Sequence, residues 1–419
     1  MKKRILGVGA LVALLLVGWF WWSGGFHSPR TYTEEELFGY YTGADPTALT
    51  QDQMVEDLRY LHEVMEENYP MFDVLERTHG VSWLDRQADH ETLIKSSSGM
   101  TTFYTTMKKI LGELKWTGHG TLVTVEEYDN KRGLYERIDK EPWLSILSHE
   151  KTAKMYGALG EKLLKSKGDE EEAQKALSSP PVNLFFKVHE ELDTAYVKIN
   201  SFGGRHMEAD LPRLQAFFDE EADRDYLIID IRGNSGGATD YWVKGITEAN
   251  IQTAYTTPGY GVFKEGRLYD LFAIQGIKAQ SMDRFPGDLQ APEEVYADFD
   301  RFYTYSMKLQ PDGSTPFKGK AIILMDEMNY SASEGFVLDA KHSGWATLIG
   351  RPSGGDGMGR DPVVFALPNS GLVVQFSLEM GLNPDGSCNE ETGTQPDILV
   401  EKGVDSLDFT LDLIGKSQL

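Results

Sequence analysis

Short apolar runs that alternate with helical patterns constrain the fold of this chain more than any other feature. Residues 226–231 and 321–325 are continuous apolar runs of the kind found in strands buried on both faces. Weaker strand patterns cover residues 184–188, 195–199, 347–349 and 372–376, and helical patterns cover residues 211–218 and 331–342. Buried strands that alternate with helices predict an α/β layer architecture, in which ligands bind at the carboxyl ends of the strands.

The chain before this region has a different, helical pattern. Thr50 and Gln53 form a capping-box pattern, and apolar residues follow at helical spacing as far as Pro70: Met54, Leu58, Leu61 and Met65. A second amphipathic helix carries Phe103, Met107, Ile110 and Leu114 on one face. That helix ends at Thr117-Gly118-His119-Gly120, before the strand-like residues 121–125.

These patterns predict five segments. We expect a membrane anchor or signal segment over residues 1–25, a polar stalk over 26–49 and a helical N-terminal subdomain over 50–118. Residues 119–183 are charged and low in pattern, and we expect a connecting region there, without a PDZ domain. The α/β domain is predicted over residues 184–419.

The amino terminus predicts the compartment. Lys2, Lys3 and Arg4 precede residues 5–22, which carry no charged side chain and as a helix would span about 27 Å, close to the thickness of a bilayer core. Trp19, Trp21 and Trp22 end this run, where aromatic rings favour the membrane interface. We therefore expect a bacterial-type membrane anchor with the bulk of the chain extracytoplasmic. The alternative is secretion after cleavage of a signal peptide near Gly25.

Composition excludes several classes of partner. The 419 residues contain 65 Asp and Glu against 41 Lys and Arg, a formal net charge of −24, which argues against nucleic-acid binding. Cys388 is the single cysteine, so neither a disulfide framework nor a cysteine zinc site is expected. No two of the nine histidines have the spacing of a zinc-binding helix. We expect neither a metal nor a cofactor.

A glycine-rich turn follows the first buried run. Residues 230–237 read Asp-Ile-Arg-Gly-Asn-Ser-Gly-Gly, and a helix opens at Thr239 or Asp240. Glycines at such a junction bring bare N–H groups close to a ligand and suit an anion or a developing oxyanion. The spacing matches neither a dinucleotide fingerprint nor a P-loop. From the residues alone, a structural turn and a binding site remain equally open.

The second buried run leads into Ser331. Ser331 and Glu334 have the spacing of a capping box, and most such pairs only cap a helix. A serine at this junction also presents its hydroxyl at the carboxyl edge of the sheet, with the Ala332 N–H ready to stabilise negative charge on a substrate oxygen. A serine nucleophile needs a neighbouring base. Among the histidines, His119 stands out because two glycines flank it in a turn, although a single histidine in a turn is more often an idle surface residue.

Six segments in this order resemble the C-terminal-processing (tail-specific) serine peptidases. The branch concerned is nearer to the tricorn core protease and the modules of interphotoreceptor retinoid-binding protein. The matching segments are residues 63–70 (EVMEENYP), 117–119 (TGH), 227–237 (LIIDIRGNSGG), 331–334 (SASE), 348–350 (LIG) and 393–400 (GTQPDILV). The resemblance implies a crotonase-like and ClpP-like ββα spiral core, and endopeptidase activity through an acyl-enzyme.

The resemblance also implies roles for individual residues. Ser331 is the nucleophile, and the N–H groups of Ala332 and of Gly236 or Gly237 form the oxyanion hole. The larger branch uses a lysine as the base, but Asp356 occupies that position here. The tricorn-like branch uses a histidine that a downstream glutamate orients through a serine. His119 then matches the base and Glu390 the orienting glutamate.

This sequence departs from the tricorn-like pattern at one position. Gly118 stands where that branch has its intermediary serine, so Thr117 or a water must relay the hydrogen bond if a relay exists. The resemblance therefore predicts an extracytoplasmic serine endopeptidase with protein or peptide substrates, His119 acting as general base on Ser331. The alternative is a non-catalytic binding module on the same fold, as the retinoid-binding relatives illustrate.

Overall fold

The computed structural model describes residues 39–167, 182–270, 277–356 and 360–419. The chain divides into two units, Met1–Tyr40 and Tyr41–Leu419, and all elements below belong to the second. The predicted anchor over residues 1–25 lies outside the described residues. Among the described residues, no helix combines the length and the apolar character that a membrane crossing requires.

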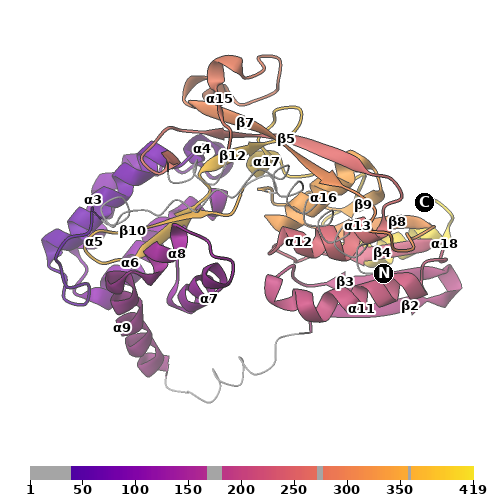
Figure 1. Ribbon diagram of the computed structural model, residues 1–419, viewed down its shortest axis with the longest axis horizontal. Coiled ribbons are helices and arrows are strands. Elements are labelled where there is room, and N and C mark those ends of the chain that lie inside the picture. The colour runs from indigo at the N-terminus through magenta and orange to yellow at the C-terminus, as the bar shows by residue number, and fades with distance from the viewer. Residues whose placement is uncertain (1–38, 168–181, 271–276, 357–359) are drawn as a thin grey trace, which may run out of the picture. The chain divides into compact units, whose positions relative to one another are not determined.

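The predicted N-terminal helices are present (Figure 1). α3 begins with the expected capping box, in which the Thr50 side chain accepts from the Gln53 N–H and the Gln53 side chain accepts from the Thr50 N–H. The buried face of α3 includes the predicted Met54, Leu58, Leu61 and Met65. The helices of this part are α3 (Gln51–Asn68), α4 (Phe72–His79), α5 (Gln87–Lys95) and α6 (Met100–Leu111), with the 3-10 turn η1 at Leu84–Arg86.

The low-pattern region after His119 is helical where the structure describes it. α7 (Val125–Arg137), α8 (Trp143–Ser148) and α9 (Glu150–Lys167) fill residues 125–167, and residues 168–181 lie outside the described part. These helices pack beside a small antiparallel sheet with the strand order β1-β11-β10. Its strands are β1 (Thr121–Leu122), β10 (Val363–Ala366) and β11 (Val373–Phe376). β1, which begins two residues after His119, therefore pairs with a strand about 250 residues further along the chain.

The predicted α/β domain is built on a six-stranded sheet with the order β13-β9-β8-β4-β3-β2. β3, β4, β8, β9 and β13 are parallel, and β2 pairs antiparallel with β3. The two apolar runs form its centre, with Ile229 of β4 opposite Ile323 of β8. The strands are β2 (Leu184–His189), β3 (Thr194–Ile199), β4 (Tyr226–Asp230), β8 (Lys320–Met325), β9 (Ala346–Gly350) and β13 (Ile398–Leu399).

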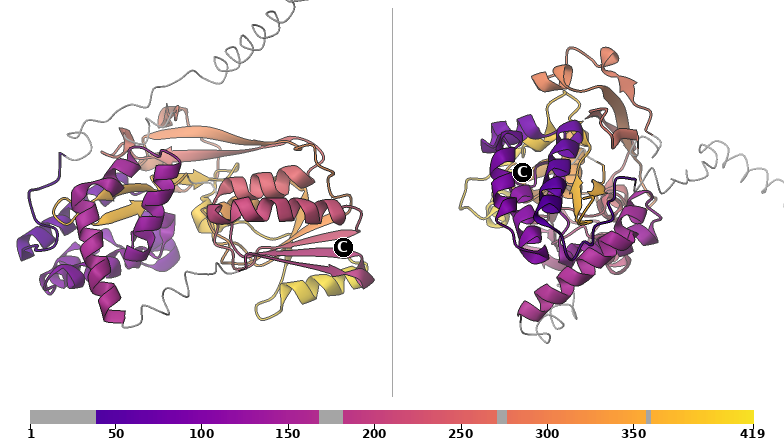
Figure 2. Two further views of the ribbon diagram at one scale, coloured as in Figure 1. Left: turned by 60° about the horizontal axis from the view of Figure 1, so that its bottom comes forward. Right: turned by 90° about the vertical axis from the view of Figure 1, so that its left-hand side faces the viewer.

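Helices cover both faces of this sheet (Figure 2). Leu214, Trp242 and Phe336 pack on one face, and they come from α11 (Met207–Glu220), α12 (Thr239–Trp242) and α16 (Ala332–Ser343). Ile414 of α18 (Ser406–Gly415) packs on the other face. A fully buried side chain of this size contributes about 1.5–3 kcal/mol of transfer free energy, so burial on both faces accounts for the continuous apolar character of the central strands.

A long antiparallel pair was not predicted. β5 (Tyr255–Phe263) and β7 (Arg301–Leu309) pair along nine residues each and join β12 (Glu379–Leu382) and β6 (Gln280–Ser281) in a sheet of order β12-β5-β7-β6. The remaining short elements are α13 (Glu248–Asn250), α15 (Glu293–Ala297) and α17 (Asn389–Thr392). The turns that follow β4, β8 and β9 all lie at the carboxyl edge of the parallel sheet, where the candidate site is found.

Candidate active site

Ser331 stands between β8 and α16 in an unusual backbone conformation. Its φ of 56° and ψ of −125° lie outside the regions that a residue with a Cβ normally occupies, and such strain costs of order 1–3 kcal/mol. The surrounding hydrogen bonds hold this conformation, because the Ser331 N–H donates to the Gly355 carbonyl at 3.3 Å and the Gly335 N–H donates to the Ser331 carbonyl at 2.9 Å.

The capping-box interpretation of Ser331 and Glu334 is wrong. The Ser331 side chain makes no capping hydrogen bond. The Glu334 carboxyl is fully buried and accepts instead from the Asn389 amide at 2.9 Å and the Thr394 hydroxyl at 2.6 Å. The Ser331 hydroxyl is therefore not engaged by the start of its own helix, which favours the second interpretation, a nucleophile.

The glycine-rich turn after β4 lies against the Ser331 turn. A Cβ at Gly236 would come within 2.6 Å of the Tyr330 carbonyl oxygen and 2.9 Å of the Ala332 nitrogen, so no other residue fits there without displacing the backbone. Asn329 joins the two turns, because its side-chain amide donates to the carbonyls of Ile231 (2.6 Å) and Asn234 (3.0 Å). Asn329 and Asn234 are fully buried, so these hydrogen bonds are shielded from water.

The three predicted oxyanion-hole amides differ in their availability. The Gly236 N–H already donates to the Asn234 side chain at 3.0 Å. The N–H groups of Gly237 and Ala332 make no hydrogen bond to any residue that the structure describes. Gly237, Ser331 and Ala332 also line one hollow of about 240 Å³, which we call the nucleophile pocket. Of the three N–H groups, those of Gly237 and Ala332 are thus the two without a hydrogen-bond partner among the described residues.

His119 lies in a tight turn that two distant elements hold in place. The Tyr69 hydroxyl, directly after α3, donates to the Thr117 carbonyl at 2.6 Å, and the Ser377 N–H, directly after β11, donates to the Gly118 carbonyl at 2.7 Å. Gly118 and His119 have positive φ angles of 52° and 57°. His119 lines a second hollow of about 600 Å³ together with Thr117, Tyr330 and Glu390, which we call the histidine pocket.

The structure explains why position 118 is a glycine. A Cβ there would lie 2.8 Å from Cγ of Met71, so a serine fits only if Met71 moves. Thr117, the predicted relay, is buried, and the hydrogen bonds it makes to described residues use its carbonyl. Neither position 118 nor the Thr117 side chain therefore provides a hydroxyl that links His119 to Glu390.

Glu390 is brought to the histidine turn but contacts its backbone. Its carboxyl accepts from the Gly118 N–H at 3.1 Å and from the Tyr330 hydroxyl at 3.1 Å. Burial, and secondly the negative charge of Asp356, raise the pKa of Glu390 well above its ordinary value. The Tyr330 hydroxyl also accepts a hydrogen bond from the backbone N–H of His119 at 3.4 Å. The rings of Tyr330 and His119 meet edge to face, with their centroids 5.0 Å apart.

The ring of His119 contacts Asp356 rather than Ser331. Nε2 of His119 lies 2.6 Å from Oδ2 of Asp356, whose side chain is 2% exposed. Among the described residues, no hydrogen bond joins the Ser331 hydroxyl to the His119 ring. Gly354 and Asp356 follow β9, and Gly355 pairs with Tyr330 in an isolated bridge, so this segment runs directly beside the nucleophile turn. Ser331, His119, Asp356 and Glu390 thus lie in one cluster of turns.

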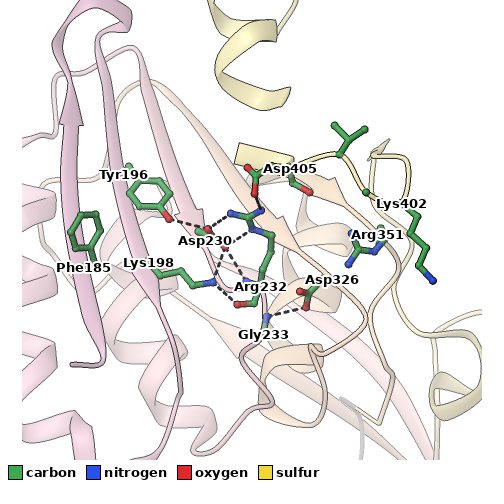
Figure 3. Close-up of a pocket in the computed structure, with 13 residues that line it drawn as sticks. Phe185, Tyr196, Lys198, Asp230, Arg232, Gly233, Asp326, Arg351, Lys402 and Asp405 are labelled. Carbon is green, nitrogen blue, oxygen red and sulfur yellow. Dashed lines mark hydrogen bonds and ion pairs between the residues drawn. The ribbon is translucent and has the colours of Figure 1, made fainter. Parts of the chain in front are cut away.

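A third hollow of about 740 Å³ opens at the same sheet edge on the α18 side (Figure 3). Its centre is Asp230, 1% exposed, which accepts from the Tyr196 hydroxyl at 2.9 Å, Nζ of Lys198 at 3.1 Å and the Arg232 guanidinium at 2.7 Å. Burial alone would raise its pKa, but the Arg232 and Lys198 cations lower the pKa of Asp230 below its ordinary value. These charges satisfy one another, and they fix the start of the turn that carries Gly237.

Sequence reasoning missed three residues of the candidate site. Asp356 was noted only as the absence of a lysine, and neither Tyr330 nor Asn234 received a role. Tyr330 directly precedes Ser331, and Asn234 lies inside the glycine-rich turn. Buried polar groups are almost always hydrogen-bonded. A side-chain amide or hydroxyl inside a buried turn could therefore have been predicted to form a hydrogen bond there. Within the described part of the chain, no group of three His, Cys, Asp or Glu residues forms a candidate metal site.

A sequence comparison relates the chain to one peptidase family. The sequence model of peptidase family S41 matches residues 193–400. No curated protein matches the chain significantly.

Several solved structures share the fold. A putative peptidase from Parabacteroides merdae ATCC 43184 is 21% identical, with 88% of this chain and 97% of that chain covered and a TM-score of 0.54. Mature CPAF is 11% identical, with coverages of 88% and 96% and a TM-score of 0.53. A serine-to-alanine mutant of CPAF is 10% identical, with coverages of 88% and 98% and a TM-score of 0.57. At these identities the likeness is one of fold.

Proposed function

Because the chain belongs to peptidase family S41 and is a serine-type peptidase, we propose that it is an endopeptidase that uses Ser331 as nucleophile and His119 as general base. The observation that carries the proposal is the strained Ser331 turn. The Ser331 side chain makes no capping hydrogen bond, and Ser331 lines one pocket with Gly237 and Ala332, whose N–H groups have no hydrogen-bond partner among the described residues. Backbone strain of this kind is found mainly at functional sites.

The proposed reaction proceeds through an acyl-enzyme. The Ser331 hydroxyl oxygen bonds to the carbon of a peptide carbonyl while the His119 imidazole takes the hydroxyl proton. The carbonyl oxygen becomes an oxyanion, which the N–H groups of Gly237 and Ala332 stabilise. His119 then gives its proton to the leaving amine as the peptide C–N bond breaks. Water, deprotonated by His119, releases the acyl group and restores the Ser331 hydroxyl.

The surroundings of the site favour a peptide or protein substrate. Trp116 and Met328 line the histidine pocket, and their side chains are 54% and 56% exposed. Large apolar side chains gathered around a hollow are typical of a surface that binds another molecule. Tyr303, Tyr305 and Met307 of β7 line the nucleophile pocket together with Ser331. A peptide bound at Ser331 would therefore meet large, largely apolar side chains.

The location of the site is part of the proposal. The basic residues 2–4 and the uncharged residues 5–22 support an N-terminal membrane anchor, with Tyr41–Leu419 held outside the cytoplasm. The alternative is release after cleavage near Gly25. Separation of the membrane and soluble fractions of cells that express the full chain, followed by determination of the mature N-terminus, distinguishes the two.

A specific observation favours the second candidate, a non-catalytic binding module. Nε2 of His119 lies 2.6 Å from Oδ2 of Asp356, and among the described residues the Ser331 hydroxyl makes no hydrogen bond to the His119 ring. Catalytic hydrogen bonds are often formed only when substrate binds, so this arrangement is compatible with both candidates. The two are separated by a reaction that requires an activated serine.

Fluorophosphonate labelling of the full chain supplies that test. We expect one labelled serine, lost in Ser331→Ala. Ser98→Ala is the matched control, because Ser98 is an exposed serine in the helical part, and it should label as the native chain does. Absence of Ser331-dependent labelling would contradict the peptidase proposal and favour the binding module.

A further inference from the structure

Asp356 stands closer to the catalytic residues than its place in the sequence suggests. The Gly354 N–H donates to the Asn329 carbonyl at 2.7 Å, and the Gly355 carbonyl accepts the Ser331 N–H at 3.3 Å. Asp356, the next residue, lines the nucleophile pocket with Ser331. Its positive φ of 55° is uncommon for a residue with a Cβ, so the turn is held in this form by its neighbours.

The contact between Asp356 and His119 is the shortest that the histidine ring makes with a carboxylate. Oδ2 and Nε2 are 2.6 Å apart, and the ring is 16% exposed. The contact is an ion pair by distance, and Oδ2 of Asp356 is buried without a hydrogen-bond partner among the described residues. Nδ1 makes no hydrogen bond to a described residue. Of the two ring nitrogens, Nδ1 is therefore the one left open.

Glu390 is less suited to orient the ring. Its oxygens are engaged by the Gly118 N–H and the Tyr330 hydroxyl, so it fixes the backbone of the turn. Burial also raises its pKa well above the ordinary value. A protonated carboxyl supplies no negative charge to an imidazolium.

We propose that Asp356 is the positioning residue of this peptidase, which holds His119 through Nε2 and balances the charge of the imidazolium. This inference rests on the proposed function. The proton of Ser331 then moves to Nδ1 as the serine oxygen bonds to the substrate carbon, while the Nε2 proton stays between His119 and Asp356. Nδ1 passes the transferred proton to the leaving amine. Asp356, which occupies the position of the lysine base in the larger branch, thus supports His119 as the base.

Several other groups face this pair. Glu390 and Tyr330 lie beside the ring, and Asp356 interacts through its charge with Glu334, Glu379 and Tyr69. Arg360 lines the nucleophile pocket with Asp356. An Asp356→Asn variant keeps all of these groups. It removes only the negative charge of the Asp356 side chain.

Asp356→Asn is compared with Glu390→Gln in the full chain. We expect kcat of Asp356→Asn to fall on the order of 10²–10⁴-fold with KM nearly unchanged, as when a triad carboxylate becomes an amide. Asp356→Glu should recover part of the activity, and Glu390→Gln should lower kcat less than Asp356→Asn does.

Nitrogen-15 NMR of His119 tests the pair independently of turnover. The native chain should show a neutral ring protonated at Nε2, and Asp356→Asn should lose this preference. A ring protonated at Nδ1, or an Asp356→Asn variant as active as the native chain or more active, would each overturn the proposal. Failure of Ser331-dependent labelling would contradict the peptidase proposal instead, and the NMR result would still decide whether Asp356 holds the ring.

Discussion

Two buried clusters near the carboxyl edge of the parallel sheet differ in how the charge of their carboxyl groups is balanced. In the Asp230 cluster (Asp230, Tyr196, Lys198, Arg232), two cations surround one carboxylate and lower its pKa. In the Asp356 cluster (Asp356, Glu334, Glu379, Glu390), Asp356 contacts the His119 ring, the charge of Arg360 acts on Glu379, and burial raises the pKa of each of the three glutamates.

The difference separates a structural role from a chemical one. A buried carboxylate with matched cations is neutralised in place and can hold a turn. Carboxyls that are buried without matched cations have raised pKa values, and perturbed pKa values of this kind gather at functional sites. The turn from Asp230 to Gly237 joins the two clusters. The Asp230 cluster holds the start of this turn, and Gly237 at its end lines the nucleophile pocket with Asp356.

The largest expected effect comes from breaking the balanced cluster. Asp230→Asn leaves Lys198 and Arg232, both 21% exposed, without their shared counter-charge, and loss of one partner of a buried pair costs about 3–5 kcal/mol. Urea denaturation at neutral pH measures the loss. Asp405→Asn is the matched control, because Asp405 binds the same guanidinium but is 53% exposed, and it should cost less than about 1 kcal/mol. Equal losses in the two variants would contradict the comparison.

The next effect is a pH dependence of opposite sign in the two clusters. Burial raises the pKa of Glu379 to about 7, so the folded chain holds a proton there that the unfolded chain loses near pH 4.5. The contribution of Glu379 is fully present below about pH 4.5 and is lost as the pH rises to about 7, which amounts to about 3 kcal/mol. Asp230, whose pKa is lowered, contributes stability above its ordinary pKa and loses it in acid.

Glu379→Gln tests that sign. The variant lacks the titrating group, so the difference in unfolding free energy between it and the native chain should shift by about 3 kcal/mol in its favour from pH 5 to pH 8. Asp57 and Asp339, with pKa values raised by burial to about 6, are unchanged in the variant and cancel in the comparison. A difference that stays constant with pH would show that Glu379 is ionised in the folded chain throughout.

The sequence predicted the central strands β4 and β8 because each carries the signal locally. The two-residue strand β13 was not predicted, and the expected strand over residues 372–376 lies in the antiparallel sheet as β11. Residues 226–231 and 321–325 are apolar on both faces, and such runs have few other places in a folded chain. β5 gave no such signal, because its sequence YTTPGYGVF contains a proline and two glycines and its side chains alternate only in part. Its partner β7 lies 38 residues further along the chain, and only that pairing defines the strand.

The candidate site was predictable in its types of residue and not in its contacts. Ser331, His119 and Gly237 were selected from turns next to strands, which is local information. The 2.6 Å contact of His119 with Asp356 joins residues 237 positions apart and depends on the bridge between Tyr330 and Gly355. The loss of Gly236 as a donor likewise depends on the rotamer of Asn234. Such contacts follow from the packing of whole turns.

The smallest expected effect compares one hydroxyl in each cluster. The Tyr196 hydroxyl donates to Asp230 at 2.9 Å, and the Tyr330 hydroxyl donates to Glu390 at 3.1 Å and accepts the His119 N–H. Removal of a buried hydrogen bond costs about 1 kcal/mol, so Tyr196→Phe and Tyr330→Phe should lose similar stability. Only Tyr330→Phe should also lower kcat, by about tenfold or less, because its hydroxyl holds the turn that carries His119. An equal fall of kcat in Tyr196→Phe would show that the two clusters are not separate in function.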